Sequence, residues 1–179
     1  MAEELHNDPR AEGATSGSAR TRGLVFGLAG GVVATIVIDL ITVAVLPLIG
    51  LPADGGFSVI GDTAAGFLAL FGIAVAGGVA LGAVMHYLIG AALGVIFGAA
   101  VTRIDALRLT SIKKGLGLGI LYTEIISLPI LVLPPIILGW AGPEAAQWFG
   151  FSIVMHAIWG AVLGGVVVFG LRSARQEGE

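Results

Sequence analysis

Two histidines occur in nearly the same sequence context, each inside an apolar stretch. The segment VMHYLIGAALG at residues 84–94 matches VMHAIWGAVLG at residues 154–164 in seven of eleven positions. These segments contain His86 and His156, and the third histidine, His6, lies in the polar N-terminal region. Histidine changes its charge near neutral pH and binds metals and haem. Because ionisable side chains are unfavourable inside a bilayer, the duplicated histidine predicts a function.

Two carboxylates also lie in apolar stretches, and with the histidines they form the predicted intramembrane polar site. At about 1.5 Å per helical residue, Asp39, His86 and His156 are expected at similar depths, with Glu124 roughly 10 Å deeper. We expect the two imidazoles within about 10 Å of each other, because the repeat gives their helices equivalent places.

Several kinds of chemistry fit these residues. Chains of histidine and carboxylate carry protons or ions through bundles, and facing histidines on a four-helix bundle can ligate haem b. Two histidines with Asp39 or Glu124 suit a divalent metal. The histidines could also serve only as hydrogen-bonding glue between helices. Motifs of the GxSxG, HExxH and P-loop types are missing and the chain has 0 Cys, so we predict that it is not an enzyme.

The composition is that of a membrane protein. The 179 residues are 56% hydrophobic and 12% charged, with 29 Gly and a mean hydropathy of +1.00. Soluble domains carry roughly 25% charged residues. The net charge of −3 argues against a nucleic-acid partner.

Apolar stretches long enough to cross a bilayer predict an all-α bundle of four transmembrane helices. The predicted spans are 23–49, 77–101, 115–140 and 146–171. Residues 64–76 are expected to form an interfacial or re-entrant helical segment, or an extension of the second span. We expect residues 1–22 to be a disordered cytoplasmic tail and residues 172–179 a second cytoplasmic tail.

The basic residues predict the orientation. All nine Lys and Arg lie before the first span, between the second and third, or after the fourth. The loops 51–62 and 141–145 hold only acidic residues among the charged types. The positive-inside rule then puts both termini in the cytoplasm.

Small residues recur every four positions in all four spans and predict the helix contacts, because small side chains let backbones approach closely. The predicted packing glycines are Gly27, Gly31, Gly82, Gly90, Gly94, Gly119, Gly160 and Gly164. The first and third spans both begin with a GLxxG pattern, at residues 23–27 and 115–119. The chain therefore reads as two helical hairpins related by a pseudo-twofold axis.

Four segments resemble the YagU-like family of small prokaryotic inner-membrane proteins: MHYLIGAALG (85–94), KKGLGLGILYTE (113–124), LPILVLPP (128–135) and FSIVMHAIWG (151–160). The resemblance implies a multi-pass protein of a prokaryotic plasma membrane, with a role in pH or envelope stress and no defined substrate. The expected functions are passage of a proton, an ion or a small solute, a haem- or metal-bearing accessory subunit, or a purely structural subunit. The expected partners are the lipid bilayer and a homo-oligomer or larger membrane complex.

Overall fold

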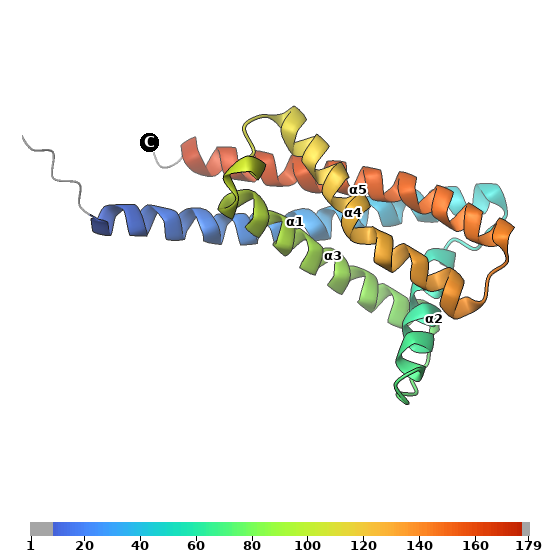
Figure 1. Cartoon of the computed structure of the whole chain (residues 1–179). Coiled ribbons are helices and arrows are strands. Elements are labelled where there is room, and N and C mark those ends of the chain that lie inside the picture. The colour runs from blue at the N-terminus through green and yellow to red at the C-terminus, as the bar shows by residue number, and fades with distance from the viewer. Residues whose placement is uncertain (1–8, 177–179) are drawn as a thin grey trace, which may run out of the picture.

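The computed structural model describes residues 9–176, and within them the chain is all-helical (Figure 1). The helices are α1 (Pro9–Val45), α2 (Gly55–Ala69), α3 (Gly78–Arg103), α4 (Ile112–Leu138) and α5 (Gly142–Gln176). Short 3-10 turns occupy Leu46–Ile49 and Asp105–Leu107.

Four helical segments of the described chain are long and apolar enough to cross a membrane: Arg20–Ile49, Gly78–Arg103, Ile112–Leu138 and Gly142–Ala174. The predictions of an all-α chain and of four apolar helices of spanning length are confirmed. An apolar segment of this length forms a helix in lipid, because a helix satisfies its own backbone polar groups.

Part of the predicted N-terminal tail is helical in the structure. Residues 9–22 belong to α1; residues 1–8 lie outside the described part. Ala, Glu and Arg in this stretch favour a helix, and lengthening an existing helix requires no new nucleus. The C-terminal stretch 172–176 likewise continues α5.

The segment between the first and second spans also differs from its prediction. Its helix, α2, begins at Gly55 inside the expected loop 51–62, and it ends at Ala69. Residues 70–77 are not helical, and Gly72 and Gly78 have φ of 77° and 82°. Glycine readily adopts this left-handed conformation, which interrupts a right-handed helix. Residues 64–76 are therefore not an extension of the second span.

The helices pack as two antiparallel pairs. Helix α1 packs along α3, and α4 packs along α5; α1 also packs on α5, and α2 packs on α3 with a smaller contact to α4. The beginning of α1, the end of α5 and the α3–α4 connection lie at one end of the bundle, the loop end (Figure 1). Helix α2 lies at the opposite end, the α2 end.

Glycines bring the helices of each pair into backbone contact. A Cβ added at Gly27 would lie 2.3 Å from the carbonyl oxygen of Gly94, and one at Gly119 would lie 2.0 Å from that of Gly160. An added Cβ would come within 3.0 Å of atoms of a neighbouring helix at every one of the predicted packing glycines, which are Gly27, Gly31, Gly82, Gly90, Gly94, Gly119, Gly160 and Gly164. Gly82 meets α2 at Phe57 rather than a spanning helix.

Bulky apolar side chains lie on both the inside and the outside of the bundle. Phe97, Val101, Leu163 and Val167 belong to a buried cluster between α1, α3 and α5. Facing outward are large apolar side chains such as Leu40, Leu88 and Ile125, each at least 60% exposed. An apolar exterior of this kind suits a lipid environment, in which helix contacts depend on close packing rather than on burial from water.

Candidate functional site

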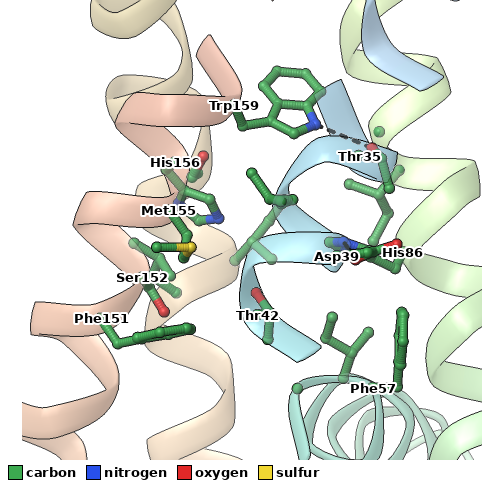
Figure 2. Close-up of a pocket in the computed structure, with 18 of the residues that line it drawn as sticks. Thr35, Asp39, Thr42, Phe57, His86, Phe151, Ser152, Met155, His156 and Trp159 are labelled. Carbon is green, nitrogen blue, oxygen red and sulfur yellow. Dashed lines mark hydrogen bonds and ion pairs between the residues drawn. The ribbon is translucent and has the colours of Figure 1, made fainter. Parts of the chain in front are cut away.

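A cavity of about 140 Å³ lies between the helix pairs, on the α2 side of the buried cluster (Figure 2). All five helices contribute to its wall. The wall is mainly apolar, and its ionisable side chains are Asp39, His86 and His156. The structure thus brings both histidines and one carboxylate to a single cavity.

Asp39 and His86 contact each other at the cavity wall. The Nε2 atom of His86 lies 3.0 Å from Oδ1 of Asp39. The second carboxylate oxygen, Oδ2, is buried and has no hydrogen-bond partner. The ring of Phe57, from α2, meets the His86 imidazole edge-on at 5.9 Å between centroids. Helix α2 therefore covers the ion pair with an aromatic ring.

His156 lies across the cavity from this pair, on α5 (Figure 2). Its Nδ1 atom is buried and lacks a hydrogen-bond partner. Buried polar atoms in native proteins are nearly always paired. Nδ1 of His156 is therefore an unsatisfied polar atom beside the cavity.

A tryptophan closes the cavity toward the loop end. The indole Nε1 of Trp159 donates a hydrogen bond to Oγ1 of Thr35 at 3.0 Å, and both side chains are buried. The Thr35 hydroxyl in turn donates to the carbonyl of Gly31 at 2.9 Å. Beyond this floor lies the apolar cluster of Phe97, Val101 and Leu163.

The contacts of the two helix pairs fix the relative heights of the polar side chains. Gly90 packs against Thr35, and Gly160 packs against Thr123. These two contacts lie at the same height along the bundle axis, because Trp159, which precedes Gly160 in α5, donates a hydrogen bond to Thr35 in α1.

Four lining residues sit one helical turn closer to the α2 end, about 6 Å from that level. We call them the polar layer: Asp39, His86, Ser127 and His156.

Glu124 is not brought to this site. It does not line the cavity, and its buried Oε1 atom has no hydrogen-bond partner. It is one position from Thr123, which turns it about 100° away on the helix. The cavity therefore groups Asp39, His86 and His156 without Glu124. Within residues described by the structure, no cluster of three or more His, Cys, Asp or Glu has metal-binding geometry. The 10 Å separation of the imidazoles stays a prediction.

Two parts of the site could not be predicted from the sequence. The Trp159–Thr35 hydrogen bond joins residues 124 positions apart, and no periodicity links an indole to a particular threonine. Phe57 lies in a stretch expected to be a loop. The rings of Trp140 and Trp148 meet edge-on at 5.7 Å between centroids, and Trp148 also lines the cavity.

Fold and site together define a class: a helical protein with four helices of membrane-spanning length and an internal cavity holding a histidine–carboxylate pair. Comparisons of the chain with protein-family models, with curated proteins and with solved structures found no match.

Proposed function

We propose that this is a non-enzymatic integral membrane protein whose polar layer serves the passage of protons, ions or a small solute. The observation that carries the proposal is the composition of one cavity wall: an Asp39–His86 pair faces an imidazole with a free buried nitrogen. Ionisable side chains inside a membrane bundle are unfavourable unless a function retains them. A structural subunit would not need a cavity around them.

The closed floor supports an alternating mechanism. The cavity ends at Trp159 and Thr35, and the apolar cluster separates it from the loop end. Passage then requires the hydrogen bond between these two side chains to break while the α1–α5 contact shifts. Transporters of two packed halves move in this way about a central site.

We also propose that the two helix pairs are structural repeats. Thr35 donates to Gly31 in α1, and Thr123 donates to Gly119 in α4, at 2.9 and 2.8 Å. The repeat register is therefore Gly31 with Gly119, not Gly23 with Gly115. In this register Ser127 stands where the first pair has Asp39, which explains why His156 lacks a carboxylate partner.

The proposed location is the plasma membrane of a prokaryote, with both termini cytoplasmic, in line with the resemblance to YagU-like proteins. The basic residues of the α3–α4 connection and the chain ends all belong to the loop end. The proposed partners are lipid and a homo-oligomer or larger complex. Gly117 and Gly150 meet nothing within 4 Å and leave open helix faces for such contacts.

Cysteine labelling tests the orientation. Asp54→Cys and Glu144→Cys are expected to react with a membrane-impermeant maleimide added to intact cells, because both positions lie at the α2 end. Lys114→Cys, at the loop end, is expected to react only after the membrane is opened. Labelling of position 114 alone in intact cells would reverse the orientation.

Proton flux into proteoliposomes tests the function. With an imposed potential or pH gradient, a small solute supplied on one side and a trapped pH dye, the wild-type protein is expected to carry protons, alone or coupled to the solute. Asp39→Asn and His86→Gln are expected to lower this flux at least about tenfold, since each removes one side of the ion pair; tenfold corresponds to about 1.4 kcal/mol of barrier. Glu124→Gln is the control, a carboxylate of a span outside the cavity. Equal flux in Asp39→Asn and wild type would refute the proposal.

The haem alternative fits the geometry less well. Nε2 of His86 is already engaged by Asp39 at 3.0 Å, and the cavity of about 140 Å³ is smaller than the 300–1,000 Å³ typical of drug-sized ligands. A reduced-minus-oxidised absorption spectrum of protein purified from haem-supplied cells is expected to be featureless. Soret and α bands that vanish in both His86→Ala and His156→Ala would establish haem instead.

A further inference from the structure

We infer that the solute of this cavity is a small organic cation about the size of benzene, which binds Asp39 in exchange for the proton of His86. The inference rests on the proposed function and names the solute class of the same site. Its evidence is the charge, the ring content and the volume of the cavity.

The charge of the wall selects a cation. Asp39 is the sole carboxylate among the lining residues, and the lining contains neither Lys nor Arg. One oxygen of Asp39, Oδ2, is buried and has no hydrogen-bond partner, and Tyr87 lies near the same carboxylate. The carboxylate attracts a cation that enters the cavity, whereas an anion would meet a carboxylate and no fixed positive charge.

The walls select an organic cation over a metal ion. Aromatic rings stand at both ends of the cavity: Trp159 at the floor, and Phe57 and Phe151 toward the α2 end (Figure 2). Ring faces attract ammonium groups, most strongly where water is excluded. A calcium ion needs six to eight oxygen ligands, whereas one carboxylate and a few hydroxyls line this wall.

The volume sets the size of the solute. A dry apolar cavity of about 150 Å³ in another protein accommodates benzene, and this cavity measures about 140 Å³. Tetramethylammonium is a probe of suitable size. Tetramethylammonium is permanently charged and has no ionisable proton. Any proton released on binding therefore comes from the protein.

The exchange is balanced in charge. The proposed exchange starts from a neutral pair, in which His86 is protonated and Asp39 is ionised. The entering cation takes the place of the imidazolium beside the carboxylate, and His86 releases its Nε2 proton to solution. One cation has entered and one proton has left, so the site stays neutral and the two movements are coupled.

Few other ionisable groups act on His86. From α1 it meets Asp39, and from α5 it faces His156 across the cavity. On its own helix Tyr87 packs edge-on at 6.2 Å and lies near Asp39. Asp62 of α2 accepts the Gly78 N–H at 2.7 Å, and Glu124 of α4 stays outside the cavity.

Calorimetric titration of the purified full-length protein with tetramethylammonium tests the exchange. Titrations in two buffers of different ionisation enthalpy count the protons released. In a buffer of about pH 5.5, where the proposed exchange has His86 protonated before binding, one proton is expected per cation bound. In a buffer of about pH 8.5, where it has His86 neutral before binding, none is expected, and the apparent affinity is expected to be higher, because no proton competes. The neutral isostere tert-butanol is expected to bind at least about tenfold more weakly.

Variants separate the roles of the two residues. Asp39→Asn is expected to weaken binding about thirtyfold or more, as loss of one partner of a buried charge pair does. His86→Gln is expected to bind the cation without releasing a proton at either pH, and Glu124→Gln to behave as wild type. The isostere comparison needs no variant, so it decides even if Asp39→Asn does not fold.

Three results would overturn the inference: no binding of tetramethylammonium, equal binding of tert-butanol, or unchanged binding by folded Asp39→Asn. Proton flux separates these from failure of the proposed function. If proton flux depends on Asp39 but tetramethylammonium does not bind, the inferred cation site is refuted and the proposed function stands. If the cation binds and releases a proton, but neither protons nor the cation cross the membrane of proteoliposomes, the proposed transport function is refuted and the cation site stands.

Discussion

Gly119→Leu is expected to prevent the bundle from folding, whereas Gly117→Leu is expected to leave it folded. A Cβ at position 119 would lie 2.0 Å from the carbonyl oxygen of Gly160, a backbone atom that cannot turn aside. A Cβ at position 117 would meet nothing within 4 Å. Overpacking by even a few carbon atoms lowers stability by about 1–3 kcal/mol, and here α4 would be forced away from α5 along their shared glycine contact.

The two variants form a matched pair, since they make the same change on the same helix. The measurements are the yield of monodisperse protein in detergent and its thermal unfolding temperature. Gly119→Ala, which adds one methyl group, is expected to fall between wild type and Gly119→Leu. If the leucine variants at 119 and 117 unfold at the same temperature, α4 and α5 do not meet at Gly119 and Gly160.

Removing the carboxylate of Asp39 is expected to lower proton flux. Introducing a carboxylate at the corresponding position of the other helix pair is expected to restore part of that flux. Asp39→Ser deprives His86 of its partner and is expected to lower proton flux at least about tenfold. In that background, Ser127→Asp introduces a carboxylate in the polar layer, at the position that corresponds to Asp39. It is expected to pair with His156 and to recover a substantial part of the flux.

Asp39→Ser combined with Ser58→Asp is the control for this exchange. Ser58 lies on α2 and does not line the cavity, so its substitution restores the net charge without entering the site. Recovery in the Ser58 combination, or none with Ser127→Asp in folded protein, would contradict the equivalence of the two helix pairs.

The sequence by itself determined four helices of membrane-spanning length and put glycines where helices contact one another. An apolar run of about twenty residues must form a helix in lipid, because no water is present to satisfy a free backbone. Four-residue spacing puts Gly27 and Gly31, or Gly160 and Gly164, on one helix face, and small faces are where membrane helices meet. These are local consequences of chain geometry, so no knowledge of the partner helix was needed.

Only the tertiary structure decided which carboxylate joins the histidines. Asp39 and Glu124 are alike in the sequence, each one acid in an apolar run, and counting residues from the span ends left both as candidates. Their depth and direction depend on how far each helix slides and turns against its neighbour. Packing at Gly31–Gly90 and Gly119–Gly160 sets that register to within one residue, which directs Asp39 into the cavity and leaves Glu124 out of it. The same packing places α2 over His86, because Gly82 admits the backbone of Phe57. A contact between distant segments depends on the shapes of both surfaces, and each segment alone encodes only one of them.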